Sequence, residues 1–125
     1  MSEEFQYRHA TTADALTLGT LATQVFLDTY ATHGINEALA REVATVYAVE
    51  VFERRLRDAA VELWMVEAGG YSVGFLDIAF ATSCPVPGVQ GAEVFRLYVQ
   101  RPFLRRGLGR ALIAKAEAAA RARGL

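Results

Sequence analysis

The sequence has little of several features that would place it in a special class of protein. Its single cysteine, Cys84, excludes a disulfide within the chain and fits a reducing compartment such as the cytoplasm. The two histidines, His9 and His33, are isolated, so we expect no metal site. No apolar run approaches the ~20 residues that span a membrane, and the acidic, polar start is unlike a secretory signal. We therefore expect a cytoplasmic protein without a membrane partner.

What remains is the composition of one soluble globular domain. The 125 residues are 53% hydrophobic and 22% charged, which is ordinary for such a domain. This length suffices for one core and is too short for two domains. No repeat, low-complexity tract or linker interrupts the chain, so residues 1–125 are interpreted as a single domain.

Charge is distributed unevenly along the chain. The net charge is −1, yet residues 101–125 contain seven basic side chains and one acidic one. The first hundred residues are correspondingly acidic. A basic end suits a phosphate-rich ligand, and an acidic remainder suits a cationic one. The alternative interpretation is a solvated helix that happens to be rich in arginine.

Hydrophobic periodicity predicts a mixed α/β (α+β) fold with the order β-α-α-β-β-β-α. A helix is expected from a cap at residues 11–14 to about Tyr30, and a second from the Asn36 cap to about Ala59. Strands are expected at 5–9, 61–66, 71–81 and 92–99, with a loop at 83–88 and a final helix that begins near Gly107. Side chains expected in the core include those of Trp64, Phe75 and Phe80.

Residues 93–113 carry the clearest chemical signal, because a strand leads through a glycine-containing turn into a helix. Such a turn presents unpaired backbone N–H groups and the positive end of the helix dipole to one point. Gly107 and Gly109 would let a phosphate approach the backbone, and Arg105, Arg106 and Arg110 would add charge. The turn therefore predicts a phosphate or pyrophosphate site, although two glycines at a helix start are by themselves a weak signal.

Other phosphate-binding and nucleic-acid-binding classes fit less well. The dinucleotide-binding pattern needs a third glycine, and Ala111-Leu112 follow instead. The P-loop sequence Gly-Lys-Ser/Thr is absent. No aromatic-interleaved basic stripe accompanies the arginines, so we expect no nucleic-acid partner, although an arginine-rich nucleic-acid binder stays a minor alternative.

The same run resembles the central cofactor motif of the GNAT superfamily of N-acetyltransferases. The strand ends in Leu97-Tyr98-Val99, and residues 104–109 match the turn, except that Leu104 stands where the family prefers Gln or Arg. Val73-Gly74-Phe75 resembles the family's third strand. Glu93-x-x-Arg96 before the strand end, and more loosely residues 26–30, are similar to the bacterial spermine/spermidine acetyltransferase subgroup.

The resemblance implies transfer of an acetyl group from acetyl-coenzyme A (acetyl-CoA) to the primary amine of a small molecule, with a polyamine as the first expectation. It implies Glu93 as general base and Asp28, Tyr30 and His33 as acceptor-binding residues. The acidic balance of the first hundred residues fits a polyamine. The expected cofactor contacts are Leu97, Tyr98, Val99, Arg105, Arg106, Gly107, Leu108, Gly109, Arg110 and Ala111.

The family's fold continues beyond the final helix with a fifth strand, a helix and a hairpin. The resemblance therefore implies a chain that stops before the fifth strand and is poorly active alone. A non-catalytic acyl-CoA-binding regulatory module is the alternative function, and a homodimer is a further expectation.

Overall fold

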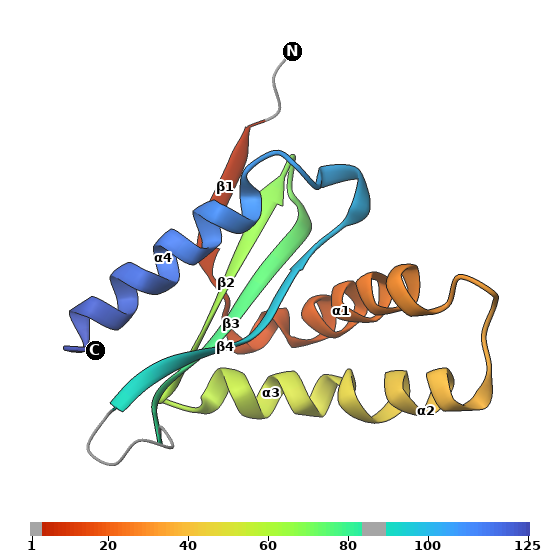
Figure 1. Cartoon of the computed structure of the whole chain (residues 1–125), viewed down its shortest axis with the longest axis horizontal. Coiled ribbons are helices and arrows are strands. Elements are labelled where there is room, and N and C mark those ends of the chain that lie inside the picture. Colours follow the sequence, from red (N-terminus) through yellow and green to blue (C-terminus); the bar gives the residue numbers. More distant parts are fainter. Residues whose placement is uncertain (1–3, 84–89) are drawn as a thin grey trace.

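The strand segments form one antiparallel sheet in the computed structural model, which describes residues 4–83 and 90–125. The strand order is β1-β2-β3-β4, so β1 and β4 are the edges of the described sheet (Figure 1). The predicted loop after residue 83, including Cys84, lies outside the described residues. The strands are β1 (Phe5–His9), β2 (Val61–Ala68), β3 (Tyr71–Ser83) and β4 (Gln90–Val99).

The prediction of a single second helical stretch is corrected by the structure, which has two helices there. Tyr47 and Ala48 leave the helical conformation, and Ala48 is extended at φ −64° and ψ 148°. The break lets Tyr47 enter the core while Phe52 of the following helix packs on the sheet. The helices are α1 (Ala15–Tyr30), α2 (Glu37–Val46), α3 (Val49–Arg57) and α4 (Leu108–Ala122), with 3-10 turns η1 (Thr12–Asp14) and η2 (Arg101–Phe103).

Local capping explains where the first helices begin, as predicted. Arg8 on β1 pairs with Asp14 at 2.8 Å, and the Thr11 N–H donates to Asp14 Oδ2, also at 2.8 Å. The Leu39 N–H donates to Asn36 Oδ1 at 2.9 Å, which caps α2. These contacts fix the direction in which α1 and α2 leave the loops before them.

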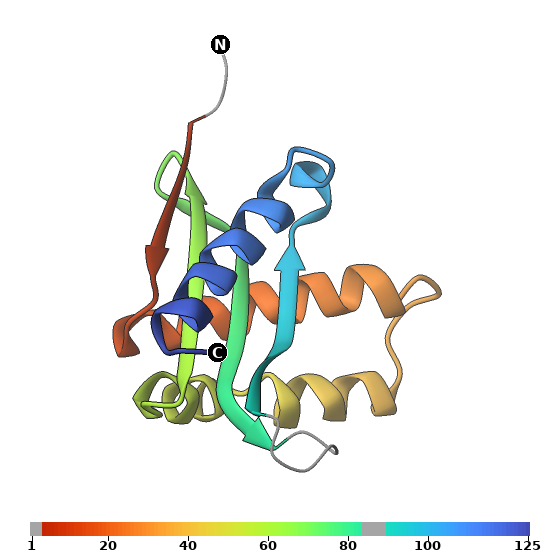
Figure 2. The ribbon, with the colours of Figure 1, turned by 60° about the vertical axis from the view of Figure 1, so that its left-hand side comes forward.

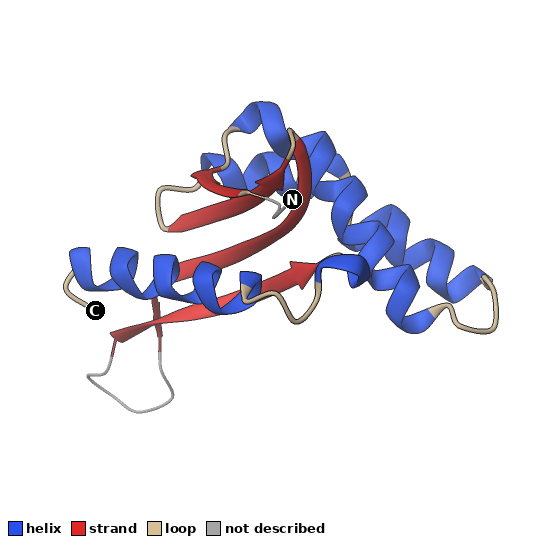
Figure 3. Ribbon diagram, turned by 90° about the horizontal axis from the view of Figure 1, so that it is seen from above, coloured by secondary structure: helices blue, strands red, loops and turns tan. Residues whose placement is uncertain are grey.

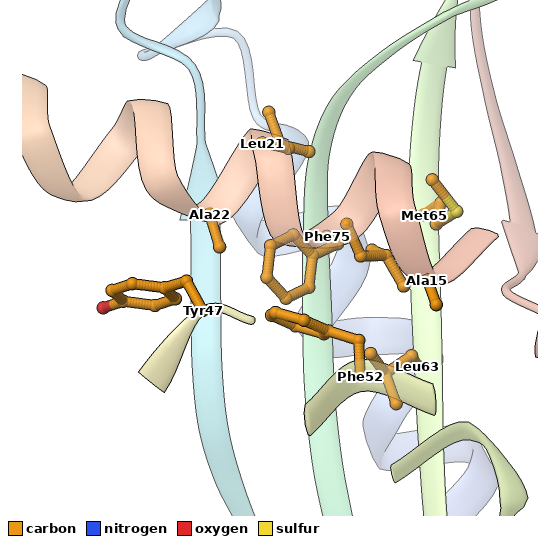
Figure 4. Packing of buried hydrophobic residues seen from close by; sticks show 9 residues of the cluster. Ala15, Leu21, Ala22, Tyr47, Phe52, Leu63, Met65 and Phe75 are labelled. Atoms are coloured by element: carbon orange, nitrogen blue, oxygen red, sulfur yellow. The ribbon is translucent and has the colours of Figure 1, made fainter. Parts of the chain in front are cut away.

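Alternating side chains on the strands build a core on each face of the sheet. Leu63, Met65 and Phe75 face α1 and α3, whereas Val66 and Leu76 face α4. Figure 2 shows α4 in front of the sheet with α1 and α3 behind it, and Figure 4 shows the cluster around Phe75. Because α4 has only one apolar stripe, it covers one face and leaves its arginines exposed.

Strand β4 contains a bulge that the sequence did not predict. Arg96 pairs with Asp77 on β3, but the next pair along the ladder is Val94 with Ile78, so Phe95 has no partner. An extra residue bends the strand and leaves its backbone groups outside the regular ladder. The bulge therefore interrupts β4 midway along its free edge. The far ends of α1 and α2 project past this strand (Figure 3).

Candidate functional site

The turn between β4 and α4 has the backbone shape of an anion site. Arg105 and Gly107 both have positive φ angles, 65° and 79°. The first hydrogen bond of α4 runs from the Ala111 N–H to the Gly107 carbonyl at 3.0 Å. The three N–H groups of residues 108–110 precede that bond, so they are the ones that the helix leaves for a ligand.

These residues line a hollow of about 590 Å³ between the turn and the end of β4. Leu97 and Val99 form its strand wall, and both also pack on the α4 side of the sheet. Leu108 is 2% exposed, so its side chain belongs to the core and only its backbone can face the hollow. The other lining residues are Phe103, Leu104, Arg105, Gly107, Gly109 and Arg110.

The lining of the hollow has the charge and the open backbone of an anion site. Among its described lining residues none is acidic, while Arg105 and Arg110 are basic and exposed. A Cβ atom added at Gly107 would have no heavy atom within 4 Å, so the backbone there is open to a ligand. Arg106, by contrast, lies over the Phe103 ring at 5.6 Å and is not in the lining. The Ala111 N–H is engaged within the helix.

The predicted strand contacts divide between the two faces of the sheet. The side chains of Leu97 and Val99 point toward α4, whereas Tyr98 points the other way, and its hydroxyl lies 2.9 Å from that of Tyr47. Burial, and next the hydrogen bond with Tyr98, raises the pKa of the Tyr47 hydroxyl. Glu93 is exposed and stands opposite Ala79, which puts it on the same face as Tyr98.

The predicted acceptor residues lie at the end of α1 and just beyond it. Asp28, Tyr30 and His33 lie there, and Tyr30 is 66% exposed. The Arg101 side chain donates to the Asp28 carbonyl at 2.7 Å, which holds this end of α1 beside the end of β4. Glu93 is six residues before that end of β4, about 20 Å along the strand. The structure thus does not bring these three residues together with Glu93.

A buried ionic cluster on the same face as Tyr98 was missed by sequence reasoning. Asp77 is 0% exposed, and both Arg55 of α3 and Arg96 of β4 donate to its carboxylate. The available signal was an acid in the middle of the apolar strand 73–80, because a buried carboxylate needs a cationic partner. Its partners, 22 and 19 positions away, could not be identified from spacing alone.

Two negative findings concern only residues 4–83 and 90–125. No three side chains of the metal-binding types His, Cys, Asp and Glu gather at one place there. No helix within that part of the chain has the length and apolar character needed to cross a membrane.

Comparisons with known proteins agree with this geometry. The PaiA N-acetyltransferase from Thermoplasma acidophilum, solved in complex with coenzyme A, matches with a TM-score of 0.81 and 19% identity over 97% of this chain and 74% of that chain. A GCN5-related N-acetyltransferase from Ralstonia eutropha matches with a TM-score of 0.75 and 21% identity over 98% of this chain and 79% of that chain. The aminoglycoside N-acetyltransferase AAC(6')-Iy in complex with CoA matches with a TM-score of 0.70 and 18% identity over 99% of this chain and 74% of that chain.

These structural likenesses establish the fold, and a sequence comparison establishes the family. No curated protein sequence matches the chain. The sequence model of the Acetyltransferase (GNAT) family matches residues 19–125, which include the whole strand–turn–helix site. Its members use acetyl-CoA as the acetyl donor. The chain therefore belongs to the GNAT family of acetyl-CoA-dependent N-acetyltransferases.

Proposed function

We propose that this N-acetyltransferase acetylates the primary amine of a small molecule, with acetyl-CoA bound along the free edge of β4 and at the start of α4. The observation that carries this proposal is the turn at residues 105–109, whose open glycine backbone and unpaired helix N–H groups lie next to that edge. The amine then approaches from the face of β4 opposite α4.

The cofactor roles follow from where each group points. The N–H groups of Leu108, Gly109 and Arg110 bind the pyrophosphate, and the Arg105 and Arg110 side chains add charge. Arg106 and Ala111 border this turn without lining the hollow, and they are proposed to help position its backbone N–H groups. The outward backbone groups of β4, near Leu97, Tyr98 and Val99, are unpaired by β3 and hold the pantetheine arm as an added strand would be held.

Once the donor is bound, the reaction needs a general base and a group that stabilises the carbonyl oxygen. Bound acetyl-CoA supplies a thioester: its carbonyl carbon accepts the amine nitrogen, and the C–S bond then breaks so that CoA leaves as a thiolate, which takes a proton from solvent. The amine must first lose a proton, and Glu93 takes it, directly or through a water. The bulge leaves Phe95 without a partner on β3, and its backbone N–H is proposed to stabilise negative charge on the carbonyl oxygen. Glu93 is two residues from that bulge.

The acceptor is proposed as a small amine. Asp28, Tyr30 and His33 remain predicted acceptor contacts, set at the end of α1 that projects past β4 (Figure 1). The polyamine acceptor, the spermine/spermidine subgroup and the homodimer also remain predictions. The cationic side chains nearest the bulge favour an acceptor that is not a polyamine.

The cofactor site is tested by titrating acetyl-CoA into the chain by calorimetry, with Gly109→Glu and Gly109→Gln compared. A Cβ at Gly109 meets only Leu97 Cδ2, at 3.7 Å, so the first atom of either side chain is accommodated, and the two side chains are nearly the same size and differ in charge. Gly109→Glu should raise Kd at least about tenfold over Gly109→Gln, which corresponds to about 1.4 kcal/mol. Kd values equal to that of the wild type in both variants would move the phosphates away from this turn.

Catalysis is tested separately by following CoA release with a panel of small amines. Glu93→Gln should lower kcat by about 10²-fold or more and leave the acetyl-CoA Kd unchanged. Tight acetyl-CoA binding without acetylation of any amine would favour the non-catalytic acyl-CoA-binding module instead.

A further inference from the structure

A second hollow, of about 420 Å³, lies between α3 and β4 on the face opposite α4. We call it the arginine pocket. It is lined chiefly by Tyr47, Arg54, Arg55, Phe95, Arg96 and Tyr98. Three of these are cationic, and none of the described lining residues is acidic.

The charge in the arginine pocket is not balanced by the carboxylate beneath it. Arg55 donates to both Asp77 oxygens, from Nε at 2.6 Å and from Nη2 at 2.7 Å, which satisfies the single negative charge. Arg96 Nη1 adds a third contact at 2.9 Å. The negative charge of Glu42 on α2 helps to raise the pKa of the Tyr47 hydroxyl, but Glu42 does not line the pocket. Two arginines on one carboxylate leave a net positive charge at this wall.

Arg54 adds to the net positive charge of the arginine pocket. It is exposed at the pocket mouth on α3, and among the described residues it has no ion-pair partner. A guanidinium carries five N–H donors, so Arg55 and Arg96 also keep donors that Asp77 does not use. The side chains of these two arginines are only 19% and 15% exposed. A partly buried cationic wall with spare donors is suited to binding an anion.

The surrounding side chains hold the cationic wall rigid. The Arg55 guanidinium lies over the Phe95 ring at 4.3 Å, and that of Arg96 lies over the Phe52 ring at 5.2 Å. The hydroxyls of Tyr47 and Tyr98 add further polar groups 2.9 Å apart. Arginines held by rings and by a carboxylate lose little side-chain freedom when an anion binds.

The pocket adjoins the place where acetyl transfer is proposed. Phe95, the bulge residue, lines it, and Arg96 and Tyr98 continue the same face of β4. The cofactor hollow lies on the other side of the strand, against Leu97 and Val99. Because β4 is the edge of the described sheet, a donor whose pyrophosphate lies in the cofactor hollow can run along that edge and place its acetyl group at the bulge, beside the arginine pocket.

We infer that the acceptor is a primary amine that also carries an anionic group, a carboxylate or a phosphate, which the arginine pocket binds. This inference rests on the proposed function. Arg54 and the outward donors of Arg55 and Arg96 bind the anion, and the amine is directed toward the bulge. A polyamine, which is cationic at every nitrogen, is repelled by the same wall.

The test uses pairs of amines that differ only in the anionic group. L-lysine is compared with 1,5-diaminopentane for a carboxylate, and O-phosphoethanolamine with ethanolamine for a phosphate, by the rate of CoA release. The anionic member of at least one pair should have a kcat/KM about tenfold or more above its partner. The pair that shows the preference identifies the anion.

Arg54→Gln should reduce that preference about tenfold, and Arg54→Glu should reverse it toward the member of the pair that lacks the anion. The matched control is Arg57→Gln on the same helix, whose side chain pairs with Glu53 at 3.5 Å and does not line the pocket. Arg57→Gln should keep the preference unchanged. Because Arg54 is exposed, its variants should fold, and unchanged far-ultraviolet circular dichroism checks this.

The outcomes separate the inference from the proposed function. Acetylation of 1,5-diaminopentane and of ethanolamine, each at a kcat/KM equal to or above that of its anionic counterpart, overturns the inference and leaves the proposed function standing. An equal loss of preference in Arg54→Gln and Arg57→Gln also overturns it. Acetyl-CoA binding without acetylation of any of the four amines overturns the acceptor assignment together with the proposed small-amine function.

Discussion

Arg55 on α3 binds both carboxylate oxygens of Asp77 on β3, at 2.6 and 2.7 Å. This ion pair connects α3 to the middle of the sheet. Asp77 is completely buried, and Arg96 on the neighbouring strand makes a further contact with it at 2.9 Å. The cluster therefore links three elements beside the bulge of β4.

Removing the carboxylate should strongly destabilise the fold. Asp77→Ala leaves the two partly buried guanidinium groups without a counter-charge, and breaking a buried pair costs about 3–5 kcal/mol of unfolding free energy. The control is Glu37→Ala, which breaks the exposed Glu37–Arg41 pair and should cost less than about 1 kcal/mol. Urea denaturation compares them, and similar losses would mean that the buried cluster contributes little.

The Tyr47 hydroxyl should make stability fall at alkaline pH. Burial first, and the hydrogen bond with Tyr98 second, raise its pKa above the usual value of 10.0. The folded chain then holds the phenol proton more tightly than the unfolded chain. This contribution is full below pH 10 and is lost as the pH rises toward the folded-state pKa.

The measurement is the unfolding free energy at about pH 9 and about pH 11, on either side of the ordinary tyrosine pKa, for the wild type and Tyr47→Phe. The wild type should lose more stability over this interval, because the phenylalanine side chain in the variant has no proton to lose. Tyr30→Phe, at an exposed tyrosine, is the control and should behave as the wild type does. Parallel losses in the wild type and Tyr47→Phe would contradict this assignment.

Asp14 should support stability on the acid side. The hydrogen bonds from Arg8 are the main cause that lowers the pKa of this carboxyl below 3.8. Its contribution is therefore present above pH 3.8 and is lost as the pH falls through the lowered folded-state pKa. Asp14→Asn should cost about 1–2 kcal/mol at neutral pH, with a smaller difference from the wild type at about pH 2.5. A difference that is the same at both pH values would rule out the charged pair as its source.

Gly74 should be required for the position of β4. A Cβ at this residue would lie 2.9 Å from the Tyr98 carbonyl oxygen and 3.0 Å from Val66 Cγ1, so the strands would have to separate. Gly74→Ala should cost about 1–3 kcal/mol and should also weaken acetyl-CoA binding, because residues 97–99 form the proposed cofactor edge. Gly91→Ala, where an added Cβ meets nothing within 4 Å, is the matched control. Full cofactor affinity in Gly74→Ala would show that the edge tolerates the shift.

Much of the fold was determined by local sequence. Strand 5–9, the cap within residues 11–14, the Asn36 cap, and the helix face of Leu18, Leu21 and Ala22 were predicted and are confirmed. The turn with Gly107 was also predicted, from two glycines between a strand and a helix, and the structure adds that Gly107 has a positive φ of 79°, which glycine adopts easily. In each case the cause lies within a few residues, so the sequence carries it.

The tertiary structure alone decided what depends on distant residues. The bulge at Phe95 arises from how β4 aligns with β3, and a strand pattern does not encode that register. The break at Tyr47 follows from the room beside Phe26 and Tyr98, with ring centroids 5.2 and 6.2 Å away. The arginine pocket exists only because side chains of α3 meet those of β4, as Arg55 does with the Phe95 ring. Periodicity reports which side chains are buried, whereas the partner that each one meets is set by packing across the whole chain.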